Sequence, residues 1–361
     1  MDFSEYTGPS AEWIALEKDL PTPAPGLSVE QLRAVTNKGR EDVAAKEMVE
    51  HAFDKKVILT DYSIPTRDGS AIEARSYRAV ATGSSDKLPV YIHLHGGGFL
   101  FGSIASEDAT CSRIVVTLAE QGVPVLVFNV NYRHTPEHKY PTAWDDTEDA
   151  FHWVHDHISE LGGDPDTIIF GGISAGGWLS ASTVLSQHLG TDKELAARPK
   201  IKGQVLLNPA LLHYDCYGPQ LAQISDPNRS SYAENRDAPV LPLERAKLFT
   251  SLLGIGSEHI VENNLRLNPA NATADQVKGL PPATLGIAGR DIMRDEGLLF
   301  AKLLSENGVP TKTTVFKGLP HGFRRFGPKL SVNKKWDETI VEGIKWALGD
   351  AEAGPFVINA F

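Results

Sequence analysis

The chain has 361 residues, of which 41% are hydrophobic and 22% are charged, and its formal net charge is −11. This length allows a large buried core without disulfides or a structural metal. The negative charge disfavours nucleic acid and anionic membranes as partners. The two cysteines, Cys111 and Cys216, form no metal-binding or disulfide pattern.

The first residues, "MDFSEYTGPSAEW", have neither the basic nor the apolar region of a secretory signal. The strongly apolar stretches, such as "VPVLVFNV", are much shorter than the ~20 residues of a membrane-spanning helix. We therefore expect a cytoplasmic protein without integral membrane association.

Residues 1–55 carry apolar side chains at helical spacing in two segments, which are joined by the linker "PTPAPG". The next segment, "VILTDYSIPTRDGSAIEARSYRA", predicts two strands that form a hairpin around Asp68 and Gly69.

From residue 88 onward, short continuous apolar runs alternate with longer helical patterns. The predicted helices cover residues 105–121, 141–160, 175–190, 294–307 and 333–348. The runs between them, such as "LPVYIHLH" and "TIIFGGIS", are typical of strands that are buried on both faces. This alternation predicts the α/β class, with a mostly parallel central sheet flanked by helices.

A polar and turn-rich segment, residues 211–280, interrupts this alternation. A structureless loop of that length is unusual in a compact domain, so we expect an inserted helical subdomain. The predicted organisation is a core in two parts, 56–210 and 281–361, with an N-terminal helical segment, 1–55, and the insertion.

The stretch "GISAG" places Ser174 in a G-x-S-x-G pattern between an apolar strand and a helix. Small residues around the serine permit the sharp turn that lifts a nucleophilic hydroxyl clear of the backbone. The following helix directs its positive N-terminal end to the same place, which favours an anion. The alternative is a glycine-rich turn in which the serine is incidental.

A second glycine pattern, "HGGG", follows another apolar strand at residues 95–98. Backbone N–H groups that stabilise a tetrahedral oxyanion need an approach that side chains would obstruct. The predicted oxyanion donors are Gly97, Gly98 and Ala175. We expect the His95 ring to brace this loop rather than to act as an acid or base.

A serine nucleophile needs a base and an acid that orients the base. His321 follows the last predicted sheet strand, in "GLPHGF", and we expect it to reach Ser174. Asp291 ends the strand "ATLGIAGRD", whereas Asp295 and Glu296 lie in the helix after it. Because a strand tip is held rigidly, we predict Asp291 as the orienting acid, with activity rising as His321 loses its proton.

The segment "FHWVHDHISE" offers an alternative metal site at His152, His155 and His157. Their spacing does not match H-E-x-x-H, and we expect a solvated helix face instead.

Together the motifs resemble hormone-sensitive-lipase-like carboxylesterases of the α/β-hydrolase fold. The matching stretches are "HGGGF", "YRHTPEHKYPTAWDD", "GISAGG", "DIMRDEG" and "HGF". The resemblance implies the same triad and oxyanion donors, and a helical cap built from residues 1–55 and 211–280. It also implies a homodimer through an edge strand or the last helix. No cofactor or metal is implied.

This chain departs from the family pattern beside the serine, where Ile173 replaces an aspartate and Trp178 replaces an asparagine. These changes concern the substrate range rather than the reaction, and Phe99 and Trp178 are the predicted substrate-binding residues. Four further aromatic residues are either pocket-lining or core residues: Trp13, Phe101, Tyr214 and Phe249. We expect Arg133 and Glu137 to form structural ion pairs.

The sequence therefore predicts a serine carboxylic ester hydrolase that acts on short-to-medium acyl or small-metabolite esters through an acyl-enzyme. Two alternatives remain on the same fold. One is a metabolite-tailoring lyase or dehydratase, or a lactone hydrolase, and the other is a binding module that uses the cap as a lid.

Overall fold

The computed structural model describes residues 1–20, 26–83 and 87–361. The predicted linker "PTPAPG" lies, except for its final glycine, outside the described residues.

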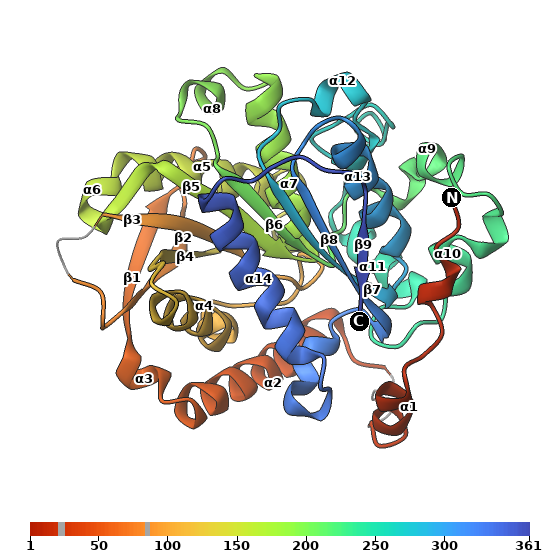
Figure 1. The fold of residues 1–361 in the computed structure, drawn as a ribbon, viewed down its shortest axis with the longest axis horizontal. Coiled ribbons are helices and arrows are strands. Elements are labelled where there is room, and N and C mark those ends of the chain that lie inside the picture. The colour runs from red at the N-terminus through yellow and green to blue at the C-terminus, as the bar shows by residue number, and fades with distance from the viewer. Residues whose placement is uncertain (21–25, 84–86) are drawn as a thin grey trace.

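The centre of the molecule is one nine-stranded sheet within these residues, in the order β1-β2-β4-β3-β5-β6-β7-β8-β9 (Figure 1). Its strands are β1 (Val57–Pro65), β2 (Ala71–Ala79), β3 (Leu88–Leu94), β4 (Leu126–Asn131), β5 (Gly163–Ile173), β6 (Gly203–Leu207), β7 (Ala283–Arg290), β8 (Thr311–Pro320) and β9 (Ile358–Ala360). The strands from β4 to β9 pair in parallel, and β1 and β2 add an antiparallel edge. The predicted α/β class and mostly parallel sheet are confirmed.

The predicted hairpin forms as β1 and β2, with Pro65 opposite Ala71. Asp68 accepts hydrogen bonds from the Thr66 hydroxyl and the Ser70 N–H, and Gly69 has a φ of +82°. These are the features for which an Asp-Gly pair is favoured in tight turns. The short strand β9 at the opposite edge was not predicted, because three residues after a polar tail carry no strand pattern.

The central strands carry apolar side chains on both faces of the sheet, and helices cover both faces. In β3, Val90 and Ile92 belong to one core and Tyr91 belongs to the other. Helices cover both cores: α5 (Thr142–Asp156), α6 (Ile158–Leu161), α7 (Ala175–Leu189), α8 (Lys193–Ala197) and α13 (Arg294–Glu306) on the first, α4 (Asp108–Glu120) and α14 (Asn333–Leu348) on the second. The alternating side chains of each strand therefore hold the two helical layers together.

The N-terminal segment is helical, as predicted. It contains η1 (Ser4–Tyr6), α1 (Ala11–Glu17), α2 (Val29–Glu50) and α3 (Phe53–Lys56). Helix α2 begins at a capping box, in which Ser28 and Gln31 each bond to the other's backbone N–H. In Figure 1 this long helix runs along one side of the core, below α4.

The insertion contains mostly short helices rather than a regular bundle. They are η3 (Tyr214–Cys216), α9 (Gly218–Leu221), η4 (Pro227–Arg229), α10 (Ser231–Glu234), α11 (Leu243–Leu252), η5 (Pro269–Asn271) and α12 (Ala274–Val277). It packs beside the N-terminal residues, since the Met1 ammonium group donates to the Gln223 carbonyl (Figure 1). The division into core and cap stays a prediction.

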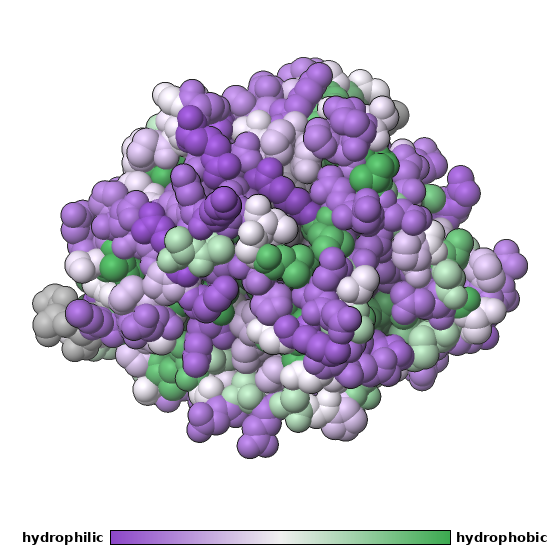
Figure 2. Space-filling model, turned by 90° about the horizontal axis from the view of Figure 1, so that it is seen from above, coloured by the Kyte–Doolittle hydropathy of each residue, from purple (hydrophilic) through white to green (hydrophobic). Residues whose placement is uncertain are grey.

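The face of the molecule shown in Figure 2 is dominated by hydrophilic side chains, with hydrophobic ones scattered among them. Among the described residues, no helix combines the length and hydrophobicity that a membrane crossing requires.

Candidate active site

Ser174 occupies a sharp turn between β5 and α7. Its φ of +56° and ψ of −115° are rare for a residue with a side chain. Backbone hydrogen bonds stabilise the turn: the Ser174 N–H donates to the Leu207 carbonyl, and the Ser174 carbonyl accepts from the N–H groups of Trp178 and Ala210. The turn therefore has the strained geometry that the G-x-S-x-G pattern predicted.

His321 lies between the serine and an acid. Its Nε2 atom is 2.9 Å from the Ser174 hydroxyl oxygen, and its Nδ1 atom is 2.6 Å from an Asp291 carboxylate oxygen. Because a carboxylate only accepts, Nδ1 carries the proton and Nε2 is free to accept from the serine. The three side chains thus form one hydrogen-bonded chain from three different strand ends.

The two other acids near Asp291 make different contacts. Asp295 pairs with Arg294 and accepts from the Ser231 N–H. Glu296 is fully buried, and this burial raises the pKa of its carboxyl well above the usual value. Neither acid reaches His321, so the structure places only Asp291 of these three beside the imidazole.

The loop that follows β3, residues 95–103 and called the glycine loop from here on, packs directly against this turn. A Cβ atom on Gly176 would lie 1.9 Å from the Leu94 carbonyl oxygen, so only glycine permits this approach of two backbones. Gly97 and Gly98 have φ values of +143° and +61°. Within the described part of the chain, the backbone N–H groups of Gly97, Gly98 and Ala175 have no hydrogen-bond partner. They remain available to an oxyanion.

His95 contacts the loop as expected of a brace. Its ring is fully buried, stacks on Tyr132 and donates from Nδ1 to the Gly96 carbonyl. Burial lowers the pKa of His95 to about 4, so the ring is neutral near pH 7.

Helix α2 holds the same loop from outside, which the sequence did not reveal. Asn37 forms paired hydrogen bonds with the Gly102 backbone, and Arg40 donates to the Gly96 carbonyl. Arg33, Asn37 and Arg40 recur at helical spacing, a signal of a shared face, but the sequence offers no indication of what that face contacts.

Segments of the insertion lie over the site. The Phe249 ring, on α11, occupies the space beside Gly98, where an added Cβ would lie 2.2 Å from it. The Asn235 amide donates to the Asp291 carbonyl. Ser174, Asp291 and His321 are only 7%, 1% and 8% exposed, so this cover leaves the triad nearly closed to solvent.

The two predicted substrate-binding residues lie in an aromatic cluster beside the turn. Phe99 stacks on Trp144 and makes an edge contact with Trp178. The Trp178 indole N–H donates to the Leu267 carbonyl, and both side chains are almost fully buried. Their contact with substrate stays a prediction.

The remaining aromatic residues that were expected in the pocket or the core lie either in the core or beside the segments that cover the triad. Trp13 is buried against Phe326, Tyr214 stacks on His213, and Phe101 makes an edge contact with Phe249.

The predicted structural ion pairs are present: Arg133 binds Asp146, and Glu137 binds Arg33 of α2.

The three histidines of α5 and its C-terminal end do not converge. Arg198 donates to His152, while His155 packs on Phe151 and His157 stacks on Trp153. The expected solvated face is wrong for His155, which is buried because it points to the first core. In residues 1–20, 26–83 and 87–361, no three His, Cys, Asp or Glu side chains could together hold a metal ion.

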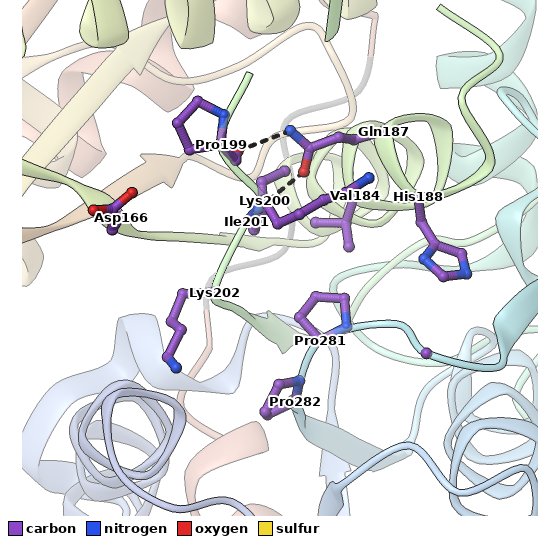
Figure 3. A pocket seen from close by; sticks show the side chains of 11 residues that line it. Asp166, Val184, Gln187, His188, Pro199, Lys200, Ile201, Lys202, Pro281 and Pro282 are labelled. Carbon is purple, nitrogen blue, oxygen red and sulfur yellow. Dashed lines mark hydrogen bonds between the residues drawn. The ribbon is translucent and has the colours of Figure 1, made fainter. Parts of the chain in front are cut away.

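A groove of about 720 Å³ lies at the other end of the sheet, where β6 and β7 begin (Figure 3). Lys200, Lys202 and Pro282 contribute to its walls. The Gln187 side-chain amide donates to the Pro199 carbonyl and accepts from the Ile201 N–H. The groove is therefore separate from the triad, which lies where the strands end.

The model of a protein family described as alpha/beta hydrolase fold matches residues 91–325. The chain belongs to this α/β-hydrolase family.

Curated relatives agree with this assignment. An AB hydrolase superfamily protein of Schizosaccharomyces pombe is 30% identical over 88% of this chain and 87% of its own length. Esterase LipI of Mycobacterium tuberculosis is 32% identical, over 71% of this chain and 72% of its own length. Carboxylesterase NlhH of the same species is 34% identical, over 67% and 68%.

Solved structures share the fold. Vibralactone cyclase has a TM-score of 0.82 with 25% identity, covering 95% of this chain and 96% of its own. The carboxylesterase EstE1, cloned from a metagenomic library, has a TM-score of 0.70 with 28% identity, covering 91% and 100%. The α/β-hydrolase relatives confirm the resemblance to hormone-sensitive-lipase-like carboxylesterases. They support the predicted class of enzyme, a carboxylic ester hydrolase, and do not favour the lyase alternative.

Proposed function

We propose that this α/β-hydrolase cleaves short-to-medium acyl or small-metabolite esters, with Ser174 as nucleophile, His321 as base and Asp291 as the orienting acid. The observation that carries the proposal is the hydrogen-bonded chain of 2.9 and 2.6 Å through His321, at a serine held in a strained turn. That order of contacts is the one that activates a serine hydroxyl.

In the first half-reaction, the Ser174 oxygen attacks the ester carbonyl and its proton moves to His321 Nε2. Asp291 keeps the other proton on Nδ1 and stabilises the imidazolium without becoming protonated. The negative oxygen of the tetrahedral intermediate accepts from the N–H groups of Gly97, Gly98 and Ala175. His321 then protonates the leaving alcohol, and the acyl group stays on Ser174.

In the second half-reaction, a water molecule replaces the alcohol. It gives a proton to His321 as it attacks the acyl-enzyme, and the carboxylic acid leaves as His321 returns the proton to Ser174. One oxyanion donor contributes roughly 10²–10³ in rate, so three backbone donors account for much of the acceleration.

We also propose that residues 1–55 and 211–280 act as a cap that opens for substrate. Their contacts with the glycine loop and with Asp291, together with the closed triad, support this role. A homodimer and a cytoplasmic location are two further proposals. Light scattering of the purified protein tests the first, and fractionation of the source cells tests the second.

The decisive experiment is hydrolysis of p-nitrophenyl esters from acetate to laurate by the wild type and by Ser174→Ala. We expect turnover that is greatest for the shorter acyl chains, and no detectable turnover by the variant. A Ser174→Ala protein that retained wild-type rates, or a folded wild type that neither cleaved an ester nor reacted with a fluorophosphonate, would contradict the proposal.

A further inference from the structure

One face of helix α2 binds backbone and side-chain groups of the glycine loop at several points. Asn37 brackets Gly102, the Glu41 carboxylate accepts from the Ser103 hydroxyl at 2.6 Å, and Arg40 reaches the Gly96 carbonyl at 2.9 Å. The three helical residues lie within one turn of each other, so a single rigid element holds the loop.

The Arg40 contact has a specific consequence for the oxyanion site. The carbonyl of Gly96 and the N–H of Gly97 belong to one planar peptide unit, in which they point in opposite directions. A guanidinium that binds the carbonyl at 2.9 Å, on an oxygen that also accepts from His95 Nδ1 at 3.2 Å, therefore helps to fix the direction of the Gly97 N–H. A charge-assisted hydrogen bond is roughly twice as strong as a neutral one, and it polarises the peptide so that its N–H becomes a better donor.

Arg40 is itself held in place from behind. Its other terminal nitrogen is 2.8 Å from Glu107, which also accepts from His93 at 3.1 Å. Burial alone would raise the pKa of Glu107, but the His93 hydrogen bond and the charge of Arg40 keep it at about 2. Glu107 is thus a buried carboxylate that orients the guanidinium towards Gly96.

We propose that Arg40 is a positioning residue of the oxyanion site, which aims and polarises the Gly97 N–H through the Gly96–Gly97 peptide unit. This inference rests on the proposed function, because it concerns the stabilisation of the same oxyanion. Helix α2 would thereby act on the oxyanion through the glycine loop, whose Gly96 carbonyl its Arg40 side chain binds.

The test compares Arg40→Gln with Arg33→Gln. Arg33 is a matched control, because it lies on the same helix face, pairs with a carboxylate and donates to the Thr135 carbonyl at 3.4 Å. We expect Arg40→Gln to lower kcat about tenfold or more with KM unchanged, since an interaction made only in the transition state is weakened. Arg33→Gln should change kcat less than about twofold.

Two additional measurements separate positioning from a general loss of structure. A trifluoromethyl ketone, which forms the oxyanion adduct reversibly, should bind Arg40→Gln more weakly by the same factor as the fall in kcat/KM. In protein labelled with glycine bearing ¹³C at the carbonyl and ¹⁵N, the Gly96–Gly97 resonance should shift in the Arg40 variant and not in the Arg33 variant. Arg40→Lys, which keeps a positive charge beside Glu107, should have a kcat between those of Arg40→Gln and the wild type. If Arg40→Gln does not fold, Arg40→Lys is compared with Arg33→Gln in its place.

The outcomes are distinguishable. Wild-type turnover combined with an unchanged kcat in the Arg40 variants, or with an effect on KM alone, overturns this inference and leaves the proposed function intact. An equal loss in Arg33→Gln also overturns it. A wild type without ester hydrolysis, or an active Ser174→Ala, refutes the proposed function itself.

Discussion

Replacement of Asp291 by asparagine tests the assignment of the acid. Asp291 is only 1% exposed, so a replacement must fit the same buried space. Asparagine has nearly the same size and shape as aspartate, and the fold should therefore be retained. The Met293 N–H donates to one carboxylate oxygen at 3.1 Å, and this donor will hold the amide oxygen of the asparagine. The amide NH₂ group then faces His321 Nδ1, which must present a lone pair, and the imidazole proton moves to Nε2.

An imidazole with its proton on Nε2 cannot accept the proton of Ser174. In a serine triad this change costs about 10⁴ in kcat, equivalent to ~5 kcal/mol of transition-state stabilisation. The assay is the steady-state hydrolysis of p-nitrophenyl butyrate at pH 8, with far-ultraviolet circular dichroism to establish that the variant is folded.

Asp295→Asn is the control for this experiment. Asp295 binds Arg294 and the Ser231 N–H rather than His321, so its replacement should lower the unfolding temperature while kcat stays within about tenfold of wild type. The assignment fails if Asp291→Asn keeps more than a tenth of wild-type kcat, or if Asp295→Asn loses as much.

Three further predictions concern stability and loop packing. Because burial raises the pKa of Glu296, the folded protein keeps a proton that the unfolded chain releases, and stability falls as the pH rises above about 4.5. Urea unfolding should show Glu296→Gln to be more stable than wild type at pH 8, with no such gain at pH 4; an equal difference at both values contradicts this. Burial lowers the pKa of His95 to about 4 in the folded protein. As the pH falls from ~6.5, this histidine is protonated in the unfolded chain before it is protonated in the folded protein, and up to ~3 kcal/mol of stability is lost by pH 4. His95→Gln should flatten that slope in the same assay, and an unchanged slope would exclude His95 as its source. Gly176→Ala should lower kcat at least tenfold and stability by ~1–3 kcal/mol, since its Cβ would lie 1.9 Å from the Leu94 carbonyl oxygen. Its control, Gly39→Ala, faces open space in α2 and should gain ~0.5–1 kcal/mol in thermal unfolding; a harmless Gly176→Ala would refute the packing argument.

Local patterns predicted most of the core. Strands β3 to β8 follow from short, mostly apolar runs, because a strand that is buried on both faces consists largely of apolar residues. The helices between them follow from apolar residues at helical spacing. The Asp68-Gly69 turn follows equally directly, since its conformation is determined by those two residues. Strand β9 escaped prediction because its pairing with β8 depends on where the tail of the chain returns.

The same distinction holds for the site. The motifs around Gly97, Ser174 and His321 were visible because short-range geometry demands particular residue types there: small residues at a strained turn, and a bare backbone beside an anion. The choice of Asp291 over Asp295 and Glu296 was an argument about strand tips, and only the 2.6 Å contact with His321 supports it directly.

By itself, the sequence determined the class of fold, the order of the strands along the chain and the residue types at the Ser174 turn and in the glycine loop. Each of these depends on spacing within a few residues. Only the tertiary structure decided that Arg40 of α2 binds Gly96, and that Phe249 and Asn235 of the insertion contact Gly98 of the glycine loop and Asp291. These contacts join segments from about 56 to more than 150 positions apart, and polar or aromatic residues on a helix face do not indicate which distant backbone they meet.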